Sequence, residues 1–98
     1  MEYEYRAEII CNQSVMDDII ESIETEISDV EYTIIENAQG SGLSSKKLGN
    51  TVWPEMNFIL FAYTNLDGAM KIKSIMEELK KKFPREGMSW FFTKSETI

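Results

Sequence analysis

The residues best suited to chemistry lie in one stretch, Gly40 to Asn57, which reads GSGLSSKKLGNTVWPEMN. Gly40 and Gly42 would let backbone N–H groups approach an anion closely, because glycine has no side chain. Lys46 and Lys47 are the first bases after a long acidic part of the chain. The stretch is therefore a candidate binding segment for a small anionic ligand, although a solvated hairpin tip would have a similar composition.

The end of this stretch restricts how the chain continues. Trp53 precedes Pro54, and proline fixes its own φ and restricts the residue before it. The pair would therefore set the direction in which the segment re-enters a sheet, and it would leave the indole of Trp53 available to stack on a ligand.

Other chemistry is limited by what the chain lacks. Histidine is absent, which excludes Ser-His-Asp and Cys-His nucleophiles and histidine metal sites. Cys11 is the sole cysteine, so no internal disulfide can form, and its apolar setting predicts a core residue. Neighbouring carboxylates such as Asp17 and Asp18 point about 100° apart on a helix, which favours a solvated face over a metal site. We predict no catalytic residue, no metal and no enzyme activity.

The composition narrows the class of protein. The chain has 98 residues, of which 43% are hydrophobic, and this predicts a single domain over residues 1–98. The net charge is −7, and no lysine or arginine occurs from Ala7 to Ser45, which argues against a nucleic-acid partner. The apolar run Phe58 to Tyr63 is too short to span a membrane, and the start MEYEYRAE has no signal-peptide pattern, so we expect a cytoplasmic protein without membrane insertion.

Hydrophobic periodicity predicts six elements that would position the segment. Strands are expected from alternating or continuous apolar residues, and helices from apolar residues at spacings of three and four. Ser14 is the expected N-cap of the first helix, and Asn65 to Gly68 is expected to form a turn and cap before the second. The predicted strands are Tyr3 to Cys11, Val30 to Asn37, Phe58 to Tyr63 and Met88 to Thr93, and the predicted helices are Met16 to Ile27 and Met70 to Phe83.

The two helices repeat one pattern. The apolar stripe Met16, Ile19, Ile20, Ile23 and Ile27 recurs 56 positions later as Ile72, Ile75, Met76, Leu79 and Phe83. Strands flank both helices in step, so the chain contains a repeated β-α-β unit. The predicted fold class is α+β, a ferredoxin-like βαββαβ plait with a long loop between its second and third strands.

One face of this plait would lack a cover. The helices of a ferredoxin-like plait lie on one side of the sheet, yet Phe58 to Tyr63 is apolar on both faces. Phe91 adds bulk on the last strand. Because so much exposed apolar surface is unusual in a monomer, we expect an oligomer that closes over the sheets.

The architecture and the loop together resemble the PII-like (nitrogen regulatory protein P-II-like) signalling proteins. The resemblance covers nearly the whole chain as architecture and is specific across the loop. The pattern similar to that of divergent members is Gly40-x-Gly42 with Gly49-x-x-Val52-Trp53-Pro54-Glu55-x-Asn57.

This resemblance implies a homotrimer whose sheets face the central axis. It implies a site for a small anionic ligand, often an adenine nucleotide (ATP, ADP or AMP), in the clefts between subunits. The long loop, called the T-loop, would report occupancy to a target protein such as a membrane transporter or an enzyme, in nitrogen regulation. By position, Gln39 and Gly40 match the loop base near the nucleotide phosphates, and Lys94 matches the basic C-terminal contacts.

The sequence also departs from the family. The glycine-rich phosphate loop before the last strand is reduced to Phe83-Pro84-Arg85-Glu86-Gly87. The long loop has no tyrosine, so the tyrosine modification of classical members has no acceptor there. Its hydroxyl side chains are Ser41, Ser44, Ser45 and Thr51.

Three alternatives stay open. The chain could be a structural or interaction plait without a ligand, a plait enzyme whose pocket the sequence does not reveal, or a relative of the CutA-like divalent-ion proteins. The absence of histidine and the glycine-containing loop argue against the last. The predicted ligand-binding residues are Gln39, Gly40, Gly42, Lys46, Lys47, Gly49, Trp53, Arg85, Gly87 and Lys94.

Overall fold

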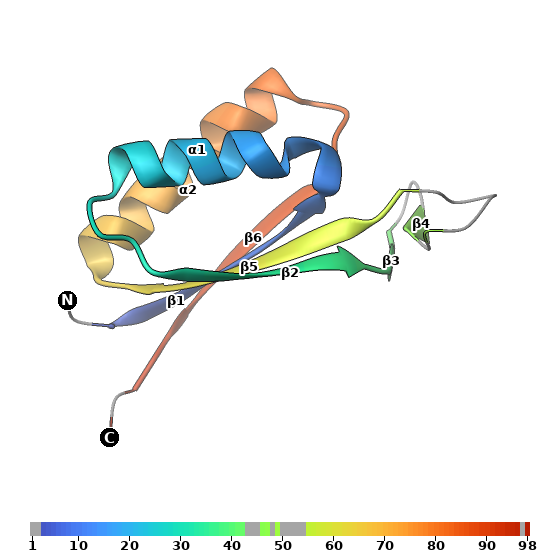
Figure 1. The fold of residues 1–98 in the computed structure, drawn as a ribbon. Helices are drawn as coiled ribbons and strands as arrows, with labels where there is room; N and C mark the ends of the chain where they lie inside the picture. The colour runs from blue at the N-terminus through green and yellow to red at the C-terminus, as the bar shows by residue number, and fades with distance from the viewer. Residues whose placement is uncertain (1–2, 43–45, 48, 50–54, 97) are drawn as a thin grey trace.

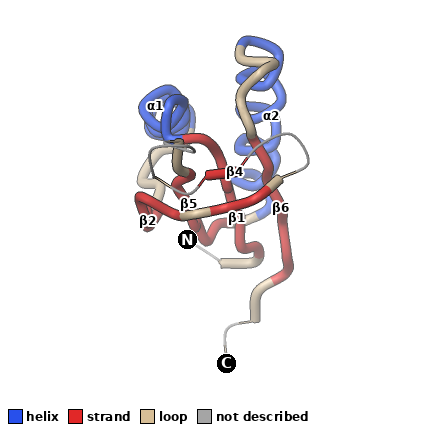
Figure 2. Tube along the Cα trace, turned by 90° about the vertical axis from the view of Figure 1, so that its right-hand side faces the viewer, coloured by secondary structure: helices blue, strands red, loops and turns tan. Residues whose placement is uncertain are grey.

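A computed structural model describes residues 3–42, 46–47, 49, 55–96 and 98. Four strands form an antiparallel sheet in the order β2-β5-β1-β6, and both helices lie on the same side of it (Figure 1; Figure 2). This confirms the predicted α+β ferredoxin-like plait. The elements are β1 (Tyr5–Asn12), the 3-10 turn η1 (Gln13–Val15), α1 (Met16–Glu26), β2 (Tyr32–Ala38), β3 (Gly40–Ser41), β4 (Lys46–Lys47), β5 (Asn57–Thr64), α2 (Leu66–Lys82) and β6 (Met88–Lys94).

The core lies between the helices and the sheet. Strands β1 and β5 occupy the centre of the sheet, so alternate side chains of both, including Ile9 and Leu60, are fully buried. The repeated helical stripe faces them, as its spacing predicts: Ile19, Ile23, Ile72 and other members are buried, and the rest pack against the core. The complete buried cluster is Ala7, Ile9, Cys11, Val15, Ile19, Ile23, Ile27, Phe58, Leu60, Ala62, Ile72, Ile75, Met76 and Leu79.

The start of α2 and the predicted cap of the first helix differ from expectation. Helix α2 begins at Leu66, one turn earlier than predicted, because Asn65 caps it: its Oδ1 accepts from the Gly68 N–H at 2.9 Å. Gly68 is not a turn residue but a packing requirement, since a Cβ there would lie 1.9 Å from Thr64 Oγ1. The prediction that Ser14 caps the first helix is wrong. The turn η1 precedes α1, and the residue that caps η1 is Asn12.

Cys11 is a core residue, as predicted. Its side chain is buried on β1, and burial raises the pKa of the thiol from 9.0 to about 11 although Lys80 and the Ser89 backbone oppose the shift. At pH 8 only about one thiol in a thousand is then ionised, which leaves little of the reactive thiolate.

We therefore expect iodoacetamide at pH 8 to modify folded protein at least about 100-fold more slowly than protein unfolded in urea. The unfolded thiol ionises first as pH rises, so the free energy of unfolding should fall from about pH 9 to 11, and Cys11→Ala should lose that part of the slope. Mass spectrometry and urea titrations measure the two effects. Equal modification rates in the two states would show that Cys11 is accessible.

Candidate ligand-binding site

The sheet face opposite the helices, here called the open face, carries large apolar side chains. The strand register places Ile59 directly opposite Ile10 on β1 and Ile35 on β2. Ile35 is 49% exposed and Phe91 is 55% exposed, while Tyr63 is also exposed. Within a single chain, this apolar surface remains in contact with water, as the doubly apolar third strand predicts.

The charges in the middle of the open face are paired. Arg6 lies with its guanidinium carbon 4.4 Å from the centroid of the Phe61 ring, and its Nη2 is 3.2 Å from Glu8 Oε1. Both side chains are about one-third exposed. Because the guanidinium stacks on an aromatic ring and neutralises the nearby carboxylate, this pair is compatible with further burial of the face.

A cavity of about 430 Å³, here called the loop-end cavity, lies at the end of the sheet from which the long segment leaves. It brings together Gln39, Gly40 and Gly42 from the start of that segment and Gly87 from the turn before β6. Four of the predicted binding residues are thus neighbours in space although two parts of the sequence supply them. The lining residues are Ile10, Ala38, Gln39, Gly40, Ser41, Gly42, Asn57, Ile59, Gly87, Met88 and Ser89.

Local backbone geometry explains how the cavity forms. Asn37 has a φ of 57°, and the β2–β5 register shifts between Ile35 and Ala38, so the chain bends out of the sheet just before Gln39. Gly40 then passes so close to β5 that a Cβ would lie 2.8 Å from Asn57 Nδ2. A side chain at position 40 would therefore require the Asn57 amide to shift, whereas a Cβ at Gly87 would meet nothing within 4 Å.

The backbone of the two predicted lysines, Lys46 and Lys47, lies beside the loop-end cavity. Strands β3 and β4 pair with Gly40 opposite Lys47 and Ser41 opposite Lys46, and they lie beyond the end of the main sheet (Figure 1). This pairing was not predicted from the sequence, which indicates only a long loop between the second and third strands. Gly49 has a φ of 68°, which favours glycine, and Trp53 lies outside the described residues.

Two predicted residues are not at this cavity within one chain. Arg85 is exposed and is not among the lining residues. Lys94 pairs with Tyr5 at the opposite end of β6 from Gly87, and its Nζ lies 6.0 Å from the centroid of the Tyr5 ring. A single chain therefore supplies the loop base of the predicted site without its basic C-terminal contact.

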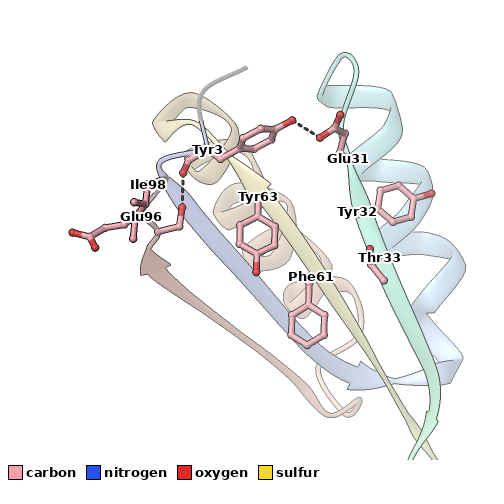
Figure 3. Close-up of a pocket in the computed structure, with 9 residues that line it drawn as sticks. Tyr3, Glu31, Tyr32, Thr33, Phe61, Tyr63, Glu96 and Ile98 are labelled. Carbon is pink, nitrogen blue, oxygen red and sulfur yellow. Dashed lines mark hydrogen bonds between the residues drawn. The ribbon is translucent and has the colours of Figure 1, made fainter.

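A second cavity of about 550 Å³ lies at the other end of the open face (Figure 3). Figure 3 shows the rings of Phe61 and Tyr63 along β5 and the Tyr3 hydroxyl donating a hydrogen bond to Glu31, which raises the pKa of Tyr3. Sequence reasoning missed this cavity because its walls come from both termini and two strands. Its lining residues are Tyr3, Glu31, Tyr32, Thr33, Phe61, Tyr63, Ser95, Glu96 and Ile98.

Electrostatics distinguish the two cavities. Among the described residues, the second cavity is lined by two carboxylates and by no lysine or arginine, so it does not suit an anion. The described residues that line the loop-end cavity include no carboxylate, and they include Gly40, Gly42 and Gly87, which have no side chain to keep an anion away from the backbone. The loop-end cavity is therefore the better candidate for an anionic ligand.

The described residues contain no cluster of three or more carboxylate or cysteine side chains arranged to hold a metal ion. In the same part of the chain, no helix has the length and apolar character needed to cross a membrane.

Comparison with known proteins gives a likeness in structure and none in sequence. No protein-family model and no curated protein sequence matches the chain. CPII from Thiomonas intermedia K12, a nitrogen regulatory PII-like protein whose structures hold ADP and bicarbonate, aligns with a TM-score of 0.76 at 15% identity. That alignment covers 96% of this chain and 87% of CPII.

Two further structures also align with nearly the whole chain. A PII-like signalling protein from Thermus thermophilus aligns with a TM-score of 0.71 at 16% identity, covering 97% of this chain and 89% of that one. The de novo designed protein Foldit4 reaches 0.60 at 13% identity, covering 95% and 99%. These alignments show that the chain has the fold of the PII-like signalling proteins, a fold that a designed protein also approaches.

Proposed function

We propose that the chain is a single PII-like domain that assembles as a homotrimer, binds an adenine nucleotide in the loop-end cavity and signals through the segment from Gly40 to Asn57. The observation that carries the proposal is the convergence of Gln39, Gly40 and Gly42 with Gly87 on one cavity. A protein of the same fold, CPII, binds ADP and bicarbonate, which supports ADP as the first ligand to test.

The chemistry of the cavity suits a nucleotide. Ile10, Ile59 and Met88 provide apolar surface on which a base can lie, and the glycines leave room for a phosphate to approach the backbone. A volume of about 430 Å³ is in the range of small-molecule sites, which run from about 300 to 1,000 Å³. Lys46 and Lys47, whose backbones pair with the cavity-lining segment, would add positive charge.

Assembly would complete the site. Lys94 lies at the far end of β6 from its own cavity, so a basic C-terminal contact to the nucleotide must come from a neighbouring subunit. The apolar open face supports such an assembly, because a trimer would remove it from water.

The proposed role is binding rather than catalysis. The sequence has no histidine, and the described residues that line the cavity include no carboxylate or thiol to act as a base or nucleophile. Occupancy would instead be reported by the Gly40 to Asn57 segment to a target protein, such as a transporter or an enzyme in nitrogen regulation.

The proposal predicts that ADP stabilises the folded protein. A ligand at 100 times its Kd adds about 2.7 kcal/mol when it binds the folded state alone, so the Tm should rise by several degrees. Differential scanning calorimetry with ADP, with and without Mg²⁺ and bicarbonate, measures the shift, and isothermal titration gives the Kd. No shift under any of these conditions would favour the ligand-free interaction plait.

Gly87 offers a sharp variant for this test. Because a Cβ at position 87 meets nothing within 4 Å, Gly87→Asp should fold normally while placing a carboxylate beside the phosphates. We expect its Kd for ADP to rise at least about tenfold, which equals about 1.4 kcal/mol, whereas the matched variant Gly87→Ser should bind like wild type. Unchanged binding by Gly87→Asp would place the nucleotide elsewhere.

A further inference from the structure

Asn12 is a buried polar residue at the end of β1, next to the loop-end cavity. Its side-chain Nδ2 donates to Glu55 Oε2 at 3.1 Å and to Glu86 Oε2 at 3.0 Å, and its Oδ1 accepts from the Ser14 N–H at 3.3 Å. The residue is only 5% exposed. The two carboxylates come from different segments, since Glu55 lies where the long segment returns to β5 and Glu86 lies in the turn before β6.

Backbone hydrogen bonds at the same place join the same segments. The Asn12 N–H donates to Gly87 O at 2.9 Å, and the Gln13 N–H donates to Met56 O at 3.1 Å. Gln13 Oε1 also accepts from the Asn37 N–H at 2.6 Å, at the bend that leads into the cavity. Asn12 and Gln13 thus contact residues in or next to three parts of the cavity wall.

We infer that Asn12 is a positioning residue that couples the return of the long segment to the turn before β6, so that the two move as one unit. Only a carboxamide can fill this position, because its two N–H groups serve two carboxylates while its oxygen still accepts. Without the amide, Glu55 and Glu86 would meet as like charges and would separate.

The two segments joined by Asn12 differ in how they are held. Lys80 on α2 donates from Nζ to Glu86 O at 2.7 Å and to Pro84 O at 3.3 Å, so the turn before β6 is braced against a helix. Glu55 is exposed and belongs to the segment that would signal. The biological role of the coupling rests on the proposed function: it would transmit occupancy of the cavity to that segment.

Amide hydrogen exchange measured by NMR tests the coupling without any ligand. In Asn12→Asp, the carboxylate still accepts from the Ser14 N–H but repels Glu55 and Glu86. We expect the backbone amides of position 12 and Gln13, whose acceptors are Gly87 O and Met56 O, to exchange at least about tenfold faster, while Ser14 keeps its protection. Equal loss at Ser14 would indicate a general loosening and would overturn the inference.

A second variant tests the coupling from one side. Glu55→Ala removes the link on the returning segment and leaves the turn before β6 braced by Lys80. The Gln13 amide, whose acceptor is Met56 O, should therefore exchange at least about tenfold faster, while the Asn12 amide, whose acceptor is Gly87 O, keeps its protection. An unchanged exchange rate of the Gln13 amide would show that the link does not hold the returning segment and would overturn the inference. Because Glu55 is exposed, this variant should fold even if Asn12→Asp does not.

Two further variants of the chain provide a matched control and a rescue experiment. Asn65→Asp makes the same chemical change at the cap of α2, where aspartate caps equally well, and it should leave exchange at Asn12 and Gln13 unchanged. Combining Asn12→Asp with Glu55→Gln and Glu86→Gln reverses the donors and acceptors, so protection should return; failure to return would contradict the inference. Absence of ADP binding would overturn the proposed function, whereas these exchange rates decide the coupling.

Discussion

Ile59→Lys is expected to convert the assembled protein into monomers while each chain keeps its fold. Ile59 lies on the open face between Ile10 and Ile35, in the part of the sheet where three aliphatic side chains adjoin across strands. In the proposed trimer this row is buried, and an unpaired ammonium group there would be taken out of water at a cost of several kcal/mol. In a monomer the same lysine would remain solvated.

Light scattering coupled to gel filtration measures this effect. Wild-type protein should give about three times the chain mass of 11.3 kDa, and Ile59→Lys should give about one chain mass with an unchanged circular dichroism spectrum. The matched control is Ser74→Lys, which adds the same side chain to the exposed surface of α2 and should stay trimeric. A wild-type monomer at micromolar concentration would contradict the trimer.

Phe58→Ala should instead destabilise the chain itself. Phe58 is the neighbour of Ile59 on β5, but its side chain points to the helices and is fully buried. Truncating a buried phenylalanine costs about 3–5 kcal/mol, through lost burial and the cavity left behind. Since small domains have about 5–15 kcal/mol in total, this change should remove a large part of the stability.

The Phe58 variants are best compared by urea denaturation in proteins that also carry Ile59→Lys, because unfolding of a monomer does not depend on protein concentration. The midpoint should fall strongly in Phe58→Ala, and much less in Phe58→Leu, which keeps most of the apolar volume. A loss below about 1 kcal/mol in Phe58→Ala would mean that the sheet and helices do not pack as described. Substitutions at the adjacent residues Phe58 and Ile59 would thus affect folding and assembly separately.

Periodicity was sufficient to predict the plait because burial acts on whole faces of elements. The stripe from Met16 to Ile27 recurs at Ile72 to Phe83, and both copies lie against the sheet. Alternation likewise placed Ile9 inside and predicted an open face on β5. Helix starts were less predictable, since Gly68 reads as a turn residue until Thr64 is seen packed against it.

The composition of the long segment pointed to Gly40 and Gly42 as binding residues, because glycine and lysine after an acidic stretch stand out without a structure, whereas Gln39 was added by the resemblance to the PII-like proteins. That Gly87 joins them, and that Lys94 does not, depends on which end of β6 lies at the end of the sheet where β2 ends and β5 begins. The second cavity also depends on the fold, because chain segments far apart in sequence form its walls.

Local sequence therefore determined the elements, their buried faces and the segment most suited to bind an anion, because each depends on residues a few positions apart. The tertiary structure alone decided the role of Asn12, which reads as the polar end of a strand. Its partners, Glu55 and Glu86, lie 43 and 74 positions away. A short-range sequence pattern cannot predict that two carboxylates bind one amide, because sheet pairing and the turn between α2 and β6 bring these three side chains together.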